Sequence, residues 1–157
     1  PIVLSFDDGY ISHFDFASKE MGNRGMTGTF YLITGNIGEG LSVSPQMVQE
    51  MYKRGMEIGS HTVNHVDARY VSNSKILEEY KTSKETLESL LVTDIEHFCY
   101  PIGGTTPYAI ETLKELGYKT SVVTKYGKAN ENQGFFLLRR IRIDYNDSSK
   151  GFLNKIK

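Results

Sequence analysis

The sequence has a single cysteine, no tryptophan and almost no net charge. Because Cys99 is alone, neither an intrachain disulfide nor a zinc site built from several thiolates can form. The 18 Lys and Arg residues nearly balance the 19 Asp and Glu residues, and the resulting charge of −1 disfavours nucleic acid as a partner. The apolar runs are as short as strands, whereas a membrane span needs about 20 residues, and the N-terminus lacks the pattern of a signal peptide. We therefore expect no nucleic-acid partner and no membrane span.

The composition is that of an ordinary globular protein. Hydrophobic residues make up 39% and charged residues 24% of the sequence. The length of 157 residues predicts a single domain over residues 1–157. The chain begins directly with an apolar, strand-like segment, Pro1–Phe6. We therefore expect a trimmed or mature form, which is compatible with the loss of an export signal.

Start and stop signals for helices are clear in this sequence. Segments 44–55 and 106–117 begin with Ser-Pro or Thr-Pro, carry an apolar stripe and end with glycine. A longer helix is predicted from about Ser74 to Leu91, with an apolar stripe on one face and Lys and Glu on the other. Another helix is predicted from about Ser12 to Asn23.

Short apolar segments alternate with these helices. They are Ile2–Phe6, Gly28–Ile33, Met56–Gly59, Ile95–Tyr100, Lys119–Thr124 and Phe135–Ile143. Most of them show little polar alternation, as strands do when both faces are covered. The order predicts an α/β fold with a parallel sheet or barrel that ends in strands. In such folds the active site lies at the carboxyl ends of the strands.

Two pairs of polar residues follow predicted strands. Asp7 and Asp8 come directly after the first strand, and His61 and His65 follow the third. Taken alone, the first pair is explained by an Asp-Gly turn whose carboxylate caps a helix, and the second by surface histidines. However, histidines four residues apart fall on one face of a helical turn, where both imidazoles can reach one metal ion.

The positions of these pairs favour a metal site. Both follow parallel strands, so both are expected at the same edge of the sheet. Two histidines and one carboxylate suit zinc, cobalt, nickel or ferrous iron and leave coordination positions open, while the second carboxylate is free to act as a base. The glycine-rich turn 98–104 after the fourth strand can point backbone N–H groups toward the same place.

Three motifs resemble those of a known family. SFDDG at 5–9, HTVNH at 61–65 and CYPIGG at 99–104 are similar, in order and spacing, to the first three motifs of the polysaccharide deacetylases of carbohydrate esterase family 4, the NodB homology domain. The segments between them, such as GTFYLITGNIG, also resemble the family. The resemblance extends over about residues 2–143.

This resemblance implies a distorted (β/α) barrel, seven-stranded or incomplete, and metal-dependent hydrolysis of acetyl groups on N-acetylated glycan. By position, Asp8, His61 and His65 match the family's ligands for one divalent metal ion, expected to be zinc, with cobalt or nickel as alternatives. Asp7 matches the catalytic base, and the backbone N–H of Ile102 matches a donor to the oxyanion. The resemblance also implies an extracellular or cell-envelope location. It leaves open the choice among peptidoglycan, chitin-like oligomers, poly-N-acetylglucosamine and acetylated xylan, as well as the oligomeric state.

The sequence departs from the family pattern at two points. Many members have an arginine that pairs with the base at the position of Cys99. We expect Arg140, on the last strand, to pair with Asp7 instead; a plain surface role is the alternative. Members also have a C-terminal histidine that acts as general acid, but no histidine follows His97 here. The acid then lies beyond Lys157 in a longer chain, is replaced by another group or water, or is lost.

Three functions are compatible with these motifs. The first is a metal-dependent polysaccharide deacetylase. The second is a glycan-binding, catalytically weak relic of the same fold, which the missing histidine favours. The presence of Asp7 favours the enzyme, because a purely structural metal site needs no second carboxylate. The third, a cysteine hydrolase using Cys99, would be inhibited by thiol alkylation and insensitive to chelators, but the sequence has no Cys–His–Asn pattern to support it.

Other residues near the predicted site have less specific expectations. His13 is expected to be an exposed residue at a helix start, and His97 a strand residue. Tyr10, Tyr100 and Tyr108 are candidates for stacking on sugar rings, whereas most tyrosines and phenylalanines are expected in the core.

Overall fold

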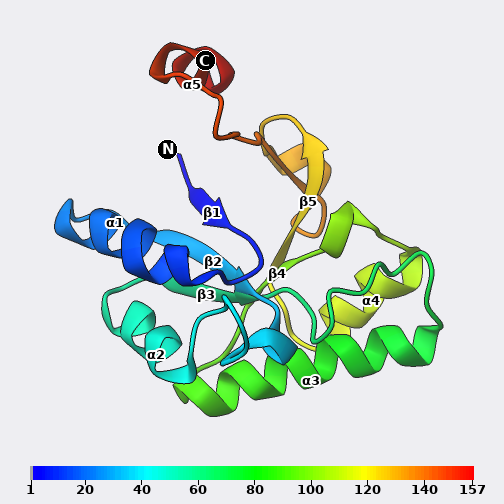
Figure 1. Ribbon diagram of the computed structural model, residues 1–157. Coiled ribbons are helices and arrows are strands. Elements are labelled where there is room, and N and C mark those ends of the chain that lie inside the picture. The colour runs from blue at the N-terminus through cyan, green and yellow to red at the C-terminus, as the bar shows by residue number, and fades with distance from the viewer. Residues whose placement is uncertain (1) are drawn as a thin grey trace.

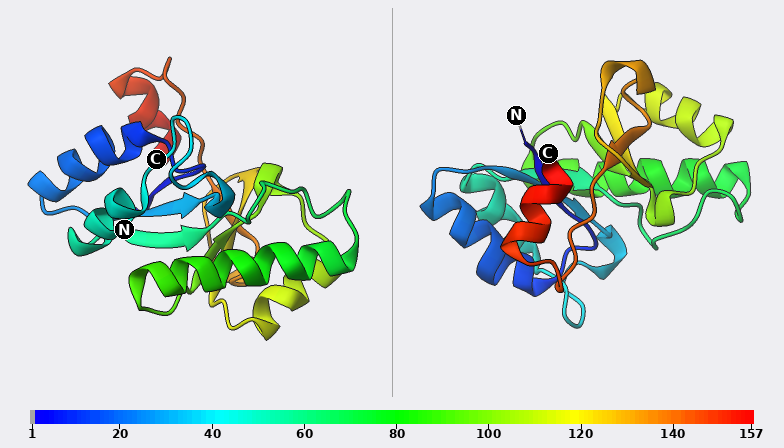
Figure 2. Two further views of the ribbon diagram at one scale, coloured as in Figure 1. Left: turned by 60° about the horizontal axis from the view of Figure 1, so that its bottom comes forward. Right: turned by 90° about the horizontal axis from the view of Figure 1, so that it is seen from above.

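A computed structural model describes residues 2–157 and shows a curled parallel sheet with helices on its outside (Figures 1 and 2). The six strands are β1 (Leu4–Phe6), β2 (Gly28–Leu32), β3 (Glu57–Ser60), β4 (His97–Cys99), β5 (Thr120–Tyr126) and β6 (Leu138–Arg140). They are hydrogen-bonded in chain order, and every neighbouring pair is parallel. The fold is a distorted (β/α) barrel that is incomplete, as the family resemblance implies.

Among the described residues, helices form in the four predicted segments, and one further helix near the C-terminus was not predicted. They are α1 (Lys19–Asn23), α2 (Pro45–Lys53), α3 (Asn73–Leu91), α4 (Pro107–Glu115) and α5 (Ser149–Ile156). The hydroxyl of Ser44 accepts a hydrogen bond from the N–H of Met47 at 3.2 Å, and that of Thr106 accepts one from Ala109 at 3.1 Å. These side-chain caps satisfy N–H groups that the first helical turn leaves unpaired, so each helix begins at its Ser-Pro or Thr-Pro pair.

Two parts of the chain differ from the sequence expectation. The segment before α1, His13–Ser18, is helical as predicted but has π-helical geometry. The predicted last strand over 135–143 shortens to Leu138–Arg140, and the chain ends in a helix rather than in strands. In Figure 1, α5 lies apart from the helices that cover the sheet, and none of its residues is buried. Its N-cap, Ser148, accepts a hydrogen bond from the N–H of Gly151 at 3.1 Å.

The core lies between the outer face of the sheet and the helices. Alternate strand side chains point to the two faces, so Phe30 and Phe98 pack against the helices, while Tyr31 and Cys99 belong to a second, smaller cluster. The helical contributions to the main core include Val48, Met51, Ile76, Tyr80, Leu87 and Leu113. Among the described residues, no helix has both the length and the apolar character needed to cross a membrane.

Helix α3 buries more than its apolar stripe. Glu79 and Ser83 lie on its packed face beside Ile76, Tyr80 and Leu87, and Glu79 is only 1% exposed. The expectation that Lys and Glu lie on the face opposite the apolar stripe is therefore wrong at Glu79. Because residues three and four apart share a helix face, Glu79 is on the same side as Ile76.

Candidate metal and catalytic site

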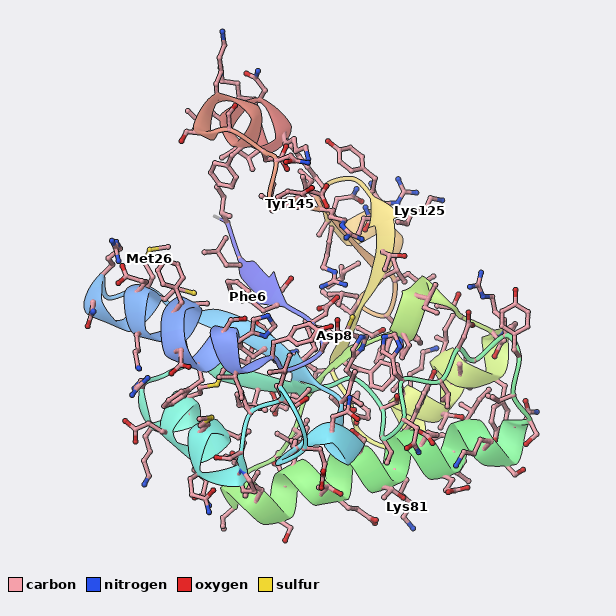
Figure 3. All side chains as sticks on the ribbon, in the orientation of Figure 1. Phe6, Asp8, Met26, Lys81, Lys125 and Tyr145 are labelled. Atoms are coloured by element: carbon pink, nitrogen blue, oxygen red, sulfur yellow. The ribbon has the colours of Figure 1, made fainter. Side chains whose placement is uncertain are left out.

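Asp8, His61 and His65 converge at the carboxyl ends of β1 and β3. The Oδ1 atom of Asp8 lies 3.4 Å from Nε2 of His61 and 3.6 Å from Nε2 of His65. One ligand atom from each of the three residues lies within 4.8 Å of the other two. Figure 3 shows Asp8 at the end of β1, near the middle of the molecule. Two imidazole nitrogens and one carboxylate oxygen fit a zinc-type metal ion and leave coordination positions for water and substrate.

The two histidines lie in a loop and not on a helical turn, so that expectation is wrong. Their rings nevertheless approach to 4.8 Å between centroids, because the loop reverses through left-handed backbone at Thr62 (φ 67°) and His65 (φ 56°). Asp8 (φ 78°) and Ile102 (φ 57°) are also left-handed. Each such residue costs of order 1–3 kcal/mol, and strained backbone of this kind clusters at functional sites.

Hydrogen bonding orients His61 toward Asp8. Its Nδ1 lies 2.7 Å from the carbonyl oxygen of Cys99, so Nδ1–H donates to that carbonyl and leaves Nε2 facing Asp8. His61 is 2% exposed, which fixes the ring. Burial and the neighbouring His61 lower the pKa of His65 more than Asp8 raises it, and this favours the neutral imidazole that a metal requires.

Asp7 faces a different partner from Asp8. The guanidinium of Arg140 donates to both oxygens of Asp7, at 2.6 Å from Nη1 and 2.7 Å from Nη2, and Nη1 also lies 3.2 Å from the hydroxyl of Ser5. Burial alone would raise the pKa of Asp7, but the hydrogen bonds and charge of Arg140 outweigh it and hold that pKa below its ordinary value. The structure thus pairs Asp7 with Arg140, keeps the carboxylate ionised and leaves it outside the Asp8–His61–His65 group.

Cys99 contacts this ion pair from inside the barrel. Its Sγ lies 3.2 Å from Nη2 of Arg140 and 3.5 Å from Oδ2 of Asp7, and the residue is fully buried. Burial and the nearby carboxylate raise the pKa of the thiol well above its ordinary value. Asp7, His61 and Cys99 also offer ligand atoms close together, but the Arg140 cation already binds Asp7 and opposes a second metal ion there. A neutral, buried thiol is a poor nucleophile.

The glycine-rich turn after β4 reaches the same edge of the sheet. Ile102 is 61% exposed, and its carbonyl accepts a hydrogen bond from the hydroxyl of Thr124 at 3.1 Å. A Cβ atom on Gly103 would collide with Thr124, and one on Gly104 would collide with Asp67. Both glycines therefore let the turn pack against its neighbours while Ile102 stays at the surface.

Comparisons with known proteins identify the family. The sequence model described as polysaccharide deacetylase matches residues 1–121. This chain belongs to the polysaccharide deacetylase family. A solved deacetylase from Streptococcus pyogenes, in complex with acetate, superposes with a TM-score of 0.94 at 30% identity, covering 99% of this chain and 70% of that chain. A Bacillus cereus polysaccharide deacetylase superposes with a TM-score of 0.89 at 26% identity, covering 100% and 51%.

A curated relative gives a similar result. The peptidoglycan-N-acetylglucosamine deacetylase of Bacillus cereus (strain ATCC 14579) is 32% identical over 92 residues, which is 59% of this chain and 41% of the relative. The chain spans between 24% and 54% of the length of the curated relatives that it matches. Arg140 lies outside the matched residues 1–121, so the pairing of Asp7 with Arg140 in this chain rests on the structure.

Other residues of this family member differ from the sequence expectation. His13 is half-buried against Phe6 and Phe30 and is not an exposed helix-start residue. Tyr100 is fully buried and cannot stack on a sugar, whereas Tyr10 and Tyr108 are 49% and 37% exposed.

His97 is a strand residue, as expected. Its Nε2 also lies 2.9 Å from Oε1 of Glu57, away from the candidate site.

Sequence reasoning missed Glu79, which contacts the loop between the two histidines. The signal was its position inside an apolar stripe, three residues after Ile76 and directly before Tyr80.

Proposed function

We propose that this chain hydrolyses acetyl groups from an N-acetylated polysaccharide outside the cell membrane, using one divalent metal ion. The observation that carries the proposal is that the adjacent carboxylates of Asp7 and Asp8 have different partners. Asp8 faces two histidines at 3.4 and 3.6 Å, whereas Asp7 is held by Arg140 and stays free of that group. A purely structural metal site would not need Asp7.

The names of relatives support this substrate class. Curated relatives include a peptidoglycan-N-acetylglucosamine deacetylase and chitin deacetylases, and a solved relative holds acetate, the expected product. We propose peptidoglycan, chitin-like or poly-N-acetylglucosamine chains as substrates. The partly exposed rings of Tyr10 and Tyr108 are candidates for sugar stacking.

Asp8, His61 and His65 would hold the metal ion, for which we propose zinc, with cobalt or nickel as alternatives. When bound, it lowers the pKa of a coordinated water molecule and polarises the acetyl carbonyl. The hydrogen bond between Nδ1 of His61 and the Cys99 carbonyl fixes the ring for this task.

Asp7 is our candidate for the general base. It accepts a proton from the attacking water, and the charge of Arg140 keeps it ionised and ready to do so. The departing amine needs a proton, and we propose two donors: protonated Asp7, which returns the proton it has accepted, or a group beyond Lys157 in a longer chain. The backbone N–H of Ile102, on the exposed turn after β4, is our candidate donor to the oxyanion.

The test is acetate release from N-acetylglucosamine oligomers and from peptidoglycan by metal-stripped protein, with and without added zinc or cobalt. We expect release only with metal. If metal binds at one ion per chain and no acetate appears, the chain is a glycan-binding relic of this fold or a part of a longer enzyme. Release that resists chelators but is inhibited by thiol alkylation would instead identify the cysteine hydrolase.

A further inference from the structure

Glu79 is a buried carboxylate to which the proposed reaction assigns no step. It is 1% exposed and lies on the packed face of α3 between Ile76 and Tyr80. A charge removed from water must be compensated by hydrogen bonds or an opposite charge. The partners of Glu79 therefore show which part of the structure this carboxylate stabilises.

Three of its hydrogen bonds come from two residues, Val63 and Asn64, in the loop that joins the two histidines. Oε2 of Glu79 accepts hydrogen bonds from the backbone N–H of Val63 at 2.9 Å and of Asn64 at 2.8 Å, and Oε1 accepts one from Nδ2 of Asn64 at 2.7 Å. Lys75 forms an ion pair with Oε1 at 3.1 Å. These bonds outweigh burial and hold the pKa of Glu79 below its ordinary value, so its charge is retained. Bonds from N–H groups to an ionised carboxylate are stronger than those between neutral groups.

The opposite side of the same loop is held by the segment after β2. The carbonyls of Thr62 and Val63 accept hydrogen bonds from the N–H of Thr34 at 3.0 Å and of Gly35 at 2.9 Å. A Cβ atom at position 35 would come to 2.6 Å from the carbonyl oxygen of Val63, so only glycine allows this approach. The loop is thus held through its carbonyls on one side and through its N–H groups on the other.

The backbone of this loop needs such support. Thr62 and His65 are left-handed, at φ 67° and 56°, a conformation that residues other than glycine keep only when their surroundings enforce it. Thr62 is β-branched, for which left-handed backbone is especially unfavourable. Without bonds at Val63 and Asn64, the loop would relax, and the side chain of His65 would leave its position 3.6 Å from Asp8.

We infer that Glu79 is a positioning residue, which holds the loop His61–His65 in the conformation that brings both imidazoles to Asp8. The inference rests on the proposed function, because it concerns the same metal site. Among the described residues, Glu79 makes no hydrogen bond to any of the three candidate ligands, and it acts through the peptide groups of Val63 and Asn64. Its effect should therefore appear in the affinity for metal and in the protection of the loop's N–H groups from hydrogen exchange.

The chain supplies a matched control for the test. Glu78 is the adjacent residue on α3, is 65% exposed and pairs with Lys75 on the surface. Glu78→Gln and Glu79→Gln remove the same charge from neighbouring positions, but only the second reaches the loop. Glu79→Ala removes all of the bonds. Glutamine can still accept from backbone N–H groups, so Glu79→Gln should retain more function than Glu79→Ala.

The first measurement is affinity for Zn²⁺ by calorimetry, together with the visible spectrum of the Co²⁺ form. We expect Glu79→Ala to weaken metal binding about 100-fold and Glu79→Gln about tenfold, and the Co²⁺ spectrum to change, while Glu78→Gln matches the unmodified protein. If both Glu79 variants fold and bind metal with unchanged affinity and spectrum, the inference is wrong.

The second measurement is amide hydrogen exchange of the metal-free protein, first in the unmodified chain, where the result does not depend on a variant folding, and then in Glu79→Gln. The N–H groups of Val63 and Asn64 should be protected, and in Glu79→Gln they should exchange at least tenfold faster, as a rough scale for the loss of a charged acceptor. The N–H of His61, which donates to the Leu32 carbonyl at 2.9 Å, should stay protected in both.

Exchange of Val63 and Asn64 as fast as in exposed loops would overturn the inference, whatever the metal affinities are. If the unmodified protein binds no metal, the proposed function fails, and the exchange measurement still decides whether Glu79 holds the loop.

Discussion

Arg140 binds Asp7 across the open side of the barrel. Arg140 ends β6 and Asp7 directly follows β1, and these strands are the two edges of the sheet. The two N–H···O bonds, at 2.6 and 2.7 Å, therefore join the first and last strands where no backbone ladder does so among the described residues. The candidate base is consequently held by the strand that lies farthest from it along the sheet.

Removing this partner should change the pH dependence of activity. Arg140 holds the pKa of Asp7 below its ordinary value, while burial raises it, so Arg140→Ala should raise the pKa. Because Asp7 acts only when ionised, the acid limb of kcat/KM should move to higher pH, by about 1–3 units. The control is Arg142→Ala, since the side chain of Arg142 is 85% exposed and pairs with Asp144. An unchanged acid limb in Arg140→Ala would remove Arg140 from the mechanism.

Asp7→Asn should separate catalysis from metal binding. Asparagine keeps the shape of the side chain but cannot accept the proton of water, so turnover should fall about 10²–10⁴-fold. Metal content, measured by atomic emission, should stay at the level of the unmodified protein, because Asp7 lies outside the Asp8–His61–His65 group. Full activity in Asp7→Asn would show that the base is another residue.

His61→Ala and His65→Ala should lose metal and activity together. Each removes one of three candidate ligands, and His61→Ala also removes the hydrogen bond to the Cys99 carbonyl. His97→Ala is the control, since His97 pairs with Glu57 away from the site. Retention of tightly bound metal in both variants would place the metal site elsewhere.

The thiol of Cys99 should be unreactive in the folded protein. It is fully buried, and its pKa lies above the ordinary value, so the thiolate is scarce at neutral pH. A chromogenic disulfide reagent should label it slowly in the native state and quickly in denaturant, and native protein incubated with the reagent should keep its activity. Rapid labelling with parallel loss of activity would favour the cysteine hydrolase.

Gly35→Ala should destabilise the protein, because the new methyl group would press on the carbonyl of Val63. We expect a loss of about 1–3 kcal/mol in the free energy of unfolding, measured by denaturant titration. Gly22→Ala is the matched control, because Gly22 lies in α1 and, apart from its chain neighbours and the backbone of its own helix, no atom lies within 4 Å of the added carbon. That substitution should stabilise the protein by about 0.5–1 kcal/mol. Equal effects of both changes would contradict the close contact at Gly35.

The sequence predicts those parts of the fold that depend on local signals. Helices α2 and α4 begin where Ser44 and Thr106 cap them, since a cap is encoded within one turn. Helix α5 was missed because it has only eight residues and includes Gly151, so the segment is short for a helix prediction. The shortening of the last strand depends on pairing with β5, which local sequence does not show.

The sequence indicates which residues form the candidate site but not the backbone conformation that brings them together. The motifs name Asp7, Asp8, His61 and His65, and the structure brings the last three together. The helical turn at the histidines was wrong because the loop is shaped by bonds to Glu79 on α3 and to Gly35, both distant in sequence. Such contacts follow from tertiary packing, which overrides local propensity.

The left-handed backbone at Thr62 and Ile102 has a consequence for directed evolution of this protein. Both residues are β-branched, and glycine would adopt the same φ values, 67° and 57°, without steric cost. A library screened for heat resistance alone should therefore enrich glycine at these two positions. Glycine would also let the backbone at these positions leave the left-handed conformation. The loop His61–His65 and the turn after β4 would then lose rigidity. Selection for thermal stability and selection for turnover should thus draw positions 62 and 102 toward different residues.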